Sequence, residues 1–417
     1  MKTIKTIFAL SLFILGLSVF LAAAPVPDDP SLEAKAKDIH TRILSVDTHC
    51  DTPGNLLDPK WDIGVRHEPG SENGGQIDLP KMKEGCLDAL FFGVFTGQGP
   101  LTPDAYAESR SKAMAQIDAI NAMTVKYADL VGKATTPADA ARLKKEGKRA
   151  AFIGLENGYP IGEDMSLVEV FARRGVRYIT LCHTSDNQIC DSGTDRRNPE
   201  DKGLSEFGRK VAAECNRLGI MIDVSHMSDR SFADVLKISK VPVIASHSCC
   251  RALCDNPRNL TDDMIKALAA NGGVLQVCFF SSYLVSPPPN PERDAAFAAL
   301  DVKYGSWSDM TADQRAAAIA EYRELHRKFP EPPARVKDVV DHIDHVIKLV
   351  GIDYVGIGTD FDGGGGVEDC SDVSQMFRVT MELLRRGYSE SQISKIWGGN
   401  AFRVLQKVID IAGAPSL

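Results

Sequence analysis

Short apolar segments alternate with amphipathic segments along most of the 417-residue chain. Helical patterns of apolar residues occupy residues 105–131, 205–218, 229–239 and 262–270, and another follows the last apolar run at 374–386. This alternation predicts a parallel sheet, and eight strands favour a closed (β/α)8 TIM-like barrel over an open doubly wound sheet. The expected strands are residues 43–48, 87–95, 150–155, 178–182, 220–225, 241–246, 273–280 and 354–359.

The connection after the seventh expected strand is too long for a simple loop. Residues 281–335 contain three consecutive prolines near their start, helical patterns at 294–300 and 311–328, and a proline-rich end. Loops that follow barrel strands gather at the catalytic face. We therefore expect a helical insertion that caps the site or forms a subunit contact. It would belong to a single domain spanning residues 25–417, in a chain that forms a homodimer.

The first residues have the pattern of a secretory signal. Lys2 and Lys5 precede an apolar run at residues 7–21, and three alanines ending at Ala24 follow it. We predict a signal peptide over residues 1–24. An uncleaved anchor is the alternative, although the run is shorter than the roughly 20 residues that span a membrane. We expect an exported protein, periplasmic or secreted, with no stable membrane span after cleavage.

Composition adds two constraints. The formal net charge is -8, which gives no basic footprint for nucleic acid. Ten cysteines in an exported chain raise the question of disulfides. They are scattered, and a core of this size does not need covalent bridges. We expect mostly buried thiols with one or two bridges, whose pairing the sequence does not give.

Six of the eight apolar runs end in residues that bind metals or exchange protons. In a barrel all strand carboxyl ends meet at one rim, so side chains distant in sequence become neighbours. A single histidine at a strand end is usually structural, but four of the nine histidines occupy such ends. We therefore predict a site at this rim, built from His49, Asp51, Glu156, His183, His226, His247, Asp360 and Asp362.

The first strand end suits a chelating pair. Positions i and i+2 of an extended chain face the same side, so His49 and Asp51 can bind one ion while Cys50 faces outward. Imidazole and carboxylate ligands together suit zinc, which keeps an open position for water in catalytic sites.

The charges of the site favour two ions. Two zinc ions bring four positive charges, which Asp51, Glu156, a bridging hydroxide and nearby Asp360 would neutralise. A single ion would leave His226 and His247 without a clear task. Two metals roughly 3.5–4 Å apart can activate a bridging water and stabilise a tetrahedral intermediate. We predict two Zn²⁺ ions, with Glu156 shared between them.

At these residues the chain resembles the renal-type membrane dipeptidases, zinc enzymes that cleave free dipeptides. The matching segments follow the family's order across most of the chain, which is far more specific than one His-x-Asp motif. They are VDTHCD (46–51), GLENG (154–158), GVRYITLCH (175–183), LGIMIDVSH (218–226), PVIASHS (242–248) and GIGTDFDG (356–363).

The resemblance implies a metal-binding role for five of these residues. His49 and Asp51 would bind the first zinc, and His226 and His247 the second. Glu156 would bridge the two ions.

The resemblance also implies catalytic and substrate-binding roles. His183 would donate a hydrogen bond to the developing oxyanion. Asp360 would take a proton from the bridging water and pass it to the leaving amine. The planar guanidinium of Arg258 would hold the substrate's terminal carboxylate.

These features favour a zinc-dependent dipeptidase that uses a metal-bridging hydroxide, with L,D-dipeptides among the candidate substrates. Two alternatives stay open. One is another binuclear-metal amide or lactone hydrolase of the same barrel superfamily. The other is a non-catalytic peptide-binding barrel, against which the full ligand set and Asp360 argue.

Overall fold

A computed structural model describes residues 29–71, 74–195, 200–305, 310–330 and 333–413. The signal peptide expected at residues 1–24 lies outside these ranges and stays a prediction. Within them, no helix is both long enough and apolar enough to cross a membrane.

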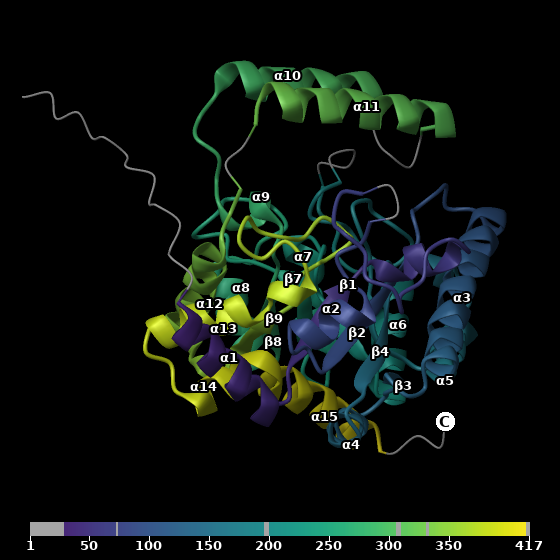
Figure 1. The fold of residues 1–417 in the computed structure, drawn as a ribbon. Coiled ribbons are helices and arrows are strands. Elements are labelled where there is room, and N and C mark those ends of the chain that lie inside the picture. The colour runs from purple at the N-terminus through teal and green to yellow at the C-terminus, as the bar shows by residue number, and fades with distance from the viewer. Residues whose placement is uncertain (1–28, 72–73, 196–199, 306–309, 331–332, 414–417) are drawn as a thin grey trace, which may run out of the picture.

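Eight parallel strands form a nearly closed barrel, as the alternating pattern predicted (Figure 1). Their order is β1-β2-β4-β5-β6-β7-β8-β9, so each barrel strand lies beside the barrel strand that follows it along the chain. The first and last strands meet just beyond β9, where Cys50 pairs with Phe361. The strands are β1 (Val46–Cys50), β2 (Ala89–Phe95), β4 (Arg149–Glu156), β5 (Val176–Thr180), β6 (Met221–Asp223), β7 (Ile244–Ser248), β8 (Val274–Val277) and β9 (Val355–Ile357).

One short strand was not predicted. β3 (Val131–Lys133) pairs only with β4, beside the barrel path. Three residues are too few to show an alternating pattern, and the helix expected at 105–131 overlapped them. The observed helix ends earlier, at Lys126.

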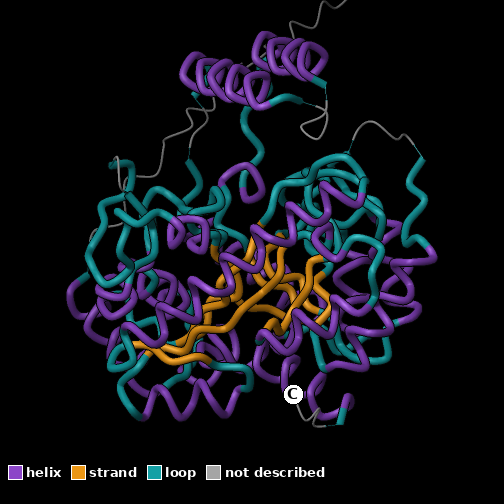
Figure 2. Tube along the Cα trace, turned by 90° about the vertical axis from the view of Figure 1, so that its right-hand side faces the viewer, coloured by secondary structure: helices purple, strands orange, loops and turns teal. Residues whose placement is uncertain are grey.

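Helices surround the strands, and Figure 2 shows the strands enclosed between them. The helical patterns at 205–218, 229–239 and 262–270 correspond to α6, α7 and α8. The helices are α1 (Pro30–Arg42), α2 (Leu79–Glu84), α3 (Pro103–Lys126), α4 (Pro137–Lys145), α5 (Ser166–Arg174), α6 (Glu206–Leu218), α7 (Asp229–Ile238), α8 (Asp262–Ala270), α12 (Val336–Val350), α13 (Phe377–Arg385), α14 (Glu390–Ser394) and α15 (Asn400–Ala412).

Apolar packing fills the interior of the barrel towards the amino ends of its strands. The Phe91 ring stacks on Phe152 and Tyr178, with centroids 4.6 and 5.5 Å away. A second, larger cluster lies between the strands and the surrounding helices. Buried polar side chains such as His49, Glu156 and His247 occur at the strand carboxyl ends instead. Packing thus fixes one end of the barrel and leaves the other for polar chemistry.

The residues between β8 and α12 contain α9 (Ser281–Leu284), α10 (Pro291–Tyr304) and α11 (Ala312–Lys328). The last two correspond to the helical patterns expected in the insertion. They pack on each other through Phe297 and Tyr322, whose ring centroids lie 6.0 Å apart. In both views this pair stands beyond the loops at one end of the barrel (Figures 1 and 2).

All ten cysteines lie within the described residues and none of them forms a disulfide, so the expectation of one or two bridges is wrong for this structure. Nine of them are buried. Cys50 and Cys182 sit in the apolar cluster between strands and helices, where a thiol packs as a small apolar group.

Candidate metal centre and substrate pocket

The closure of the barrel brings the first and last strand ends together. The backbone N–H of Asp51 donates to the carbonyl of Phe361 at 2.8 Å, and the N–H of Asp360 donates to the carbonyl of His49 at 3.1 Å. His49 and Asp51 therefore lie beside Asp360, although the rest of the barrel separates them along the chain.

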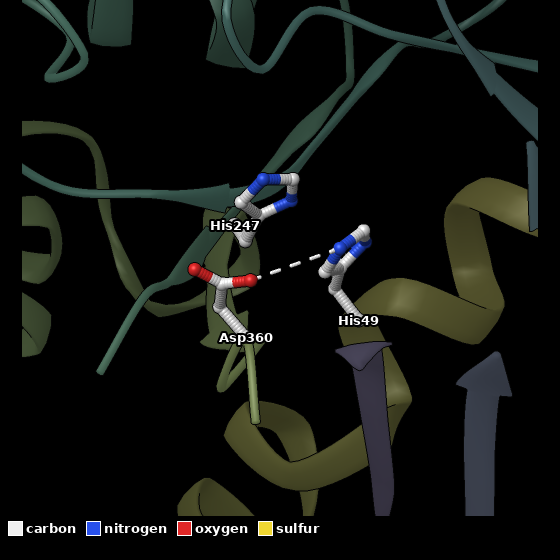
Figure 3. Close-up of side chains that lie close together, drawn as sticks. All are labelled: His49, His247 and Asp360. Atoms are coloured by element: carbon white, nitrogen blue, oxygen red, sulfur yellow. Dashed lines mark ion pairs between the residues drawn. The ribbon is translucent and has the colours of Figure 1, made fainter. Parts of the chain in front are cut away.

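The side chain of His49 faces three carboxylates. Its Nε2 atom lies 3.5 Å from Asp51 Oδ2 and 3.4 Å from Glu156 Oε2. The same atom lies 3.9 Å from Asp360 Oδ1, the contact that Figure 3 shows as a dashed line. Its Nδ1 atom lies 2.7 Å from the Tyr178 hydroxyl on the opposite side. Within the described part of the chain, neither His49 Nε2 nor Asp51 Oδ1, both of them buried, has a hydrogen-bond partner. Buried nitrogen and oxygen atoms that face each other without hydrogen-bond partners are suitable ligands for a cation.

A second group converges on the other oxygen of Glu156. The Nε2 atoms of His226 and His247 lie 3.1 and 3.4 Å from Glu156 Oε1, and 3.0 Å from each other. Lone pairs of two imidazoles and a carboxylate that point at one place repel each other unless a cation or proton lies between them. Each carboxylate oxygen of Glu156 therefore faces a separate group of possible metal ligands. A ligand shared between two ions would have this arrangement.

The charge states of the groups fit the same interpretation. Burial and the neighbouring Glu156 raise the pKa of Asp51 to about 6. Although burial opposes it, the neighbouring imidazoles, His49 and His183 foremost, hold the pKa of Glu156 well below its usual value. Burial, with His49 nearby, lowers the pKa of His247 to about 3. His247 is thus a neutral imidazole beside an ionised carboxylate, which is the form that binds metals. His49 differs, because Tyr178 and Glu156 raise its pKa well above the usual value although burial opposes this shift.

His183 and Arg258 flank this cluster. His183 Nε2 lies 3.7 Å from Glu156 Oε1, and its ring centroid lies 4.1 Å from that of His226. Arg258 is only 4% exposed, yet its Nε and Nη1 atoms have no hydrogen-bond partner. Its Nη2 atom donates a hydrogen bond to the carbonyl of His247 at 3.3 Å. A buried guanidinium with open donors is a binding group for an anion.

Most of these side chains open onto one cavity of about 490 Å³. His49 is the exception, because it lies behind Asp51 and Glu156 and is fully buried. The predicted residues on the cavity wall are Asp51, Glu156, His183, His226, His247, Arg258, Asp360 and Asp362.

The cavity wall also contains side chains that the sequence did not single out. Phe95 and Phe280 end the second and seventh expected strands, which carry no metal-binding residue there. The position of these two phenylalanines at strand ends could therefore have identified them as cavity residues, whatever their residue type. Tyr283 belongs to α9 and lies under Arg258, whose guanidinium carbon is 5.2 Å from the ring centroid. The other residues are Gly54, Asn55, Gln116, Thr184 and Gly363.

The backbone is unusual at this rim. Among the described residues, five other than glycine have positive φ, and four of them lie here: Asn157 (72°), His226 (70°), Asp360 (63°) and Asp362 (65°). A Cβ on Gly363 would lie 1.9 Å from Asp51 Oδ2, so only glycine fits against the carboxylates. Left-handed backbone in residues other than glycine is concentrated at functional sites.

Comparisons with known proteins identify the family to which the chain belongs. The family pattern described as Membrane dipeptidase (Peptidase family M19) matches residues 33–415. Dipeptidase tcpJ of Claviceps purpurea is 31% identical over 359 residues, covering 85% of this chain and 74% of that protein. Dipeptidase ataJ of Aspergillus terreus is 31% identical over 404 residues, covering 91% and 88%.

A solved structure shows the same relationship. The crystal structure of the probable dipeptidase PvdM from Pseudomonas aeruginosa has a TM-score of 0.81 and 31% identity, covering 91% of this chain and 99% of that one. The resemblance inferred from the sequence motifs is thereby confirmed. The chain belongs to the membrane dipeptidase family, Peptidase family M19, and is a hydrolase of the metallo-dipeptidase type.

Proposed function

We propose that the chain is a two-zinc dipeptidase that hydrolyses dipeptides with free amino and carboxyl ends, L,D-dipeptides among them. The observation that carries this proposal is the buried cation Arg258 on the same cavity wall as Glu156, which faces two ligand groups. A site for one terminal carboxylate beside a binuclear metal centre fits a small peptide.

The metal ligands would be His49 and Asp51 for one zinc and His226 and His247 for the other, with Glu156 between them. The unpartnered atoms His49 Nε2 and Asp51 Oδ1 support this assignment. When bound, the two ions supply Lewis acidity, which lowers the pKa of water and polarises a carbonyl.

Arg258 would bind the substrate's carboxylate. Its Nε and Nη1 atoms have no hydrogen-bond partner among the described residues, and either can form a fork with Nη2 that binds the two oxygens of a carboxylate. Because the guanidinium is buried at a fixed position, it selects substrates whose carboxylate lies one residue beyond the scissile bond. A tripeptide would place its carboxylate too far away.

Asp360 would carry the proton. Burial and the charge of Asp51 raise the pKa of its carboxyl well above the usual range, so this group can hold a proton and release it to the leaving amine. His183 would donate to the developing oxyanion. Burial lowers its pKa to about 4, so the ring is neutral at pH 7 and carries one N–H donor.

The test is an assay of the zinc-loaded protein on a substrate panel. We expect turnover of dipeptides and of some L,D-pairs, with little or no turnover of an N-acetylated dipeptide or a tripeptide. Equal turnover of dipeptides and capped substrates would contradict the proposal and favour a broader amide or lactone hydrolase. Absence of both bound zinc and turnover would favour a peptide-binding barrel.

We also propose that residues 1–24 are removed on export, that residues 25–417 form one domain with a helical insertion at 281–335, and that the protein is a periplasmic or secreted homodimer. Support comes from the signal-like pattern before Ala24 and from the helix pair α10–α11, which stands beyond the barrel loops (Figure 1). N-terminal sequencing of the native protein and light scattering test these statements. An N-terminus at Met1 or a monomer would contradict them.

A further inference from the structure

A buried carboxylate inside the barrel is hydrogen-bonded to the residue that contacts His247, one of the proposed metal ligands. Asp223, the last residue of β6, is fully buried. Its Oδ1 atom accepts the backbone N–H groups of Ser225 and Ser246 at 3.0 and 2.8 Å. Its Oδ2 atom accepts the hydroxyls of Thr180 and Ser246 at 2.5 and 2.6 Å. Four donors on one carboxylate hold it in a single orientation.

The hydroxyl of Ser246 links this carboxylate to His247. Ser246 Oγ lies 2.8 Å from His247 Nδ1. Because the hydroxyl proton is donated to Asp223, Ser246 Oγ can only accept at this contact, and His247 Nδ1 must carry the proton. The lone pair of the ring then lies on Nε2, the atom that faces Glu156 at 3.4 Å.

We propose that Asp223, acting through Ser246, is a positioning residue that fixes His247 in the tautomer able to bind metal. This inference rests on the proposed function, in which His247 binds zinc. Hydrogen bonding at the second ring nitrogen sets the tautomer and basicity of a histidine ligand.

Among the described residues, the other two histidines proposed as ligands have no comparable hydrogen bond that fixes the tautomer. His226 Nδ1 is buried and has no hydrogen-bond partner among the residues that the structure describes. His49 Nδ1 contacts the Tyr178 hydroxyl, which can donate or accept and so leaves the tautomer open. The fixed tautomer is therefore specific to His247, and its loss should affect the zinc held by His226 and His247.

Asp223→Asn tests the direction of the hydrogen bonds. The asparagine oxygen must stay on the two backbone N–H groups, so its NH₂ takes the place of Oδ2 and donates to Ser246 Oγ. The hydroxyl proton then turns to His247 Nδ1 and places the ring proton on Nε2. An amide replacing a carboxylate in a Ser-His-Asp triad has the same effect on its histidine. We expect zinc affinity at one of two sites to fall about 10- to 100-fold.

The readouts are the zinc content per chain at buffered free zinc and competition with a chromogenic chelator. We expect two ions in the wild type and one in Asp223→Asn at intermediate free zinc. The matched control is Asp88→Asn, another buried carboxylate at the opposite end of the barrel, which accepts from Ser45 N and Lys144 Nζ. It should lower stability and leave zinc binding unchanged.

A folded Asp223→Asn protein with wild-type affinity at both sites would overturn the inference. If this variant does not fold, Ser246→Ala takes its place, because it removes the acceptor without adding a donor. Unchanged zinc affinity in Ser246→Ala would equally overturn it. Failure of the wild type to bind zinc would instead refute the proposed function.

Discussion

Replacing Arg258 should separate activity from stability. The substitution Arg258→Met keeps the length of the side chain and removes its charge and donors. In the folded protein the guanidinium is 4% exposed and makes a hydrogen bond of 3.3 Å. Its Nε and Nη1 atoms have no hydrogen-bond partner among the described residues. Losing one partner of a buried, hydrogen-bonded charge pair costs about 2–5 kcal/mol, or roughly 30- to 5000-fold in kcat/KM.

Arg258→Met should lower activity but increase the stability of the folded protein. A buried cation without a compensating anion is costly, since its desolvation alone amounts to several kcal/mol. Without substrate, Arg258→Met should therefore raise the free energy of unfolding, by about 1 kcal/mol or more. Urea unfolding of the metal-loaded protein measures this change.

The assay compares a dipeptide with its carboxyl-terminal amide. Arg258→Met should lower kcat/KM for the dipeptide alone, because the amide offers no carboxylate to bind. The matched control is Arg251→Met in the same loop region, whose guanidinium is already paired with Asp229 at 2.7 Å. Arg251→Met should leave kcat/KM unchanged for both the dipeptide and its amide. Equal losses on dipeptide and amide, or an unchanged KM for the dipeptide, would refute the role of Arg258.

Three further outcomes are expected. Asp360→Asn should lower kcat about 10²- to 10⁴-fold, with zinc content unchanged by metal analysis. Gly363→Ala should lower kcat more than about tenfold, since its Cβ would lie 1.9 Å from Asp51 Oδ2, whereas Gly97→Ala meets nothing within 4 Å and should be silent in the same assay. Burial lowers the pKa of His40 from 6.5 to about 4. Its contribution to stability is therefore complete above pH 6.5 and lost as the pH falls towards 4, by up to about 3 kcal/mol. His40→Gln should flatten this part of the urea-unfolding profile, and an unchanged acid dependence would contradict the assignment.

The sequence predicted the barrel and its rim because both depend on local rules. Apolar runs define strands, and the topology then places every strand carboxyl end at one rim. Residues far apart in sequence, such as His49, Glu156 and His226, are brought together by this rule alone. The same rule did not identify Tyr283, because α9 follows β8 within a long connection whose path depends on tertiary packing.

Two other features depend on three-dimensional contacts that the periodicity of apolar residues in the sequence does not reveal. The short strand β3 exists only because β4 offers it an edge. The hydrogen bonds around Asp223 join residues of β5, β6 and β7, and their direction follows from donors that a sequence does not place. The predicted disulfides failed for a similar reason, since spacing along a chain does not show which thiols become neighbours.

The left-handed residues at the rim set a limit on engineering this protein. Asn157, His226, Asp360 and Asp362 each adopt positive φ, which costs a residue with a side chain about 1 kcal/mol or more relative to glycine. Their sum is a sizeable share of the roughly 5–15 kcal/mol that holds a typical protein together. A selection for thermal tolerance alone would therefore favour glycine at these positions. It would yield a more stable barrel that lacks the side chains proposed to act at this rim.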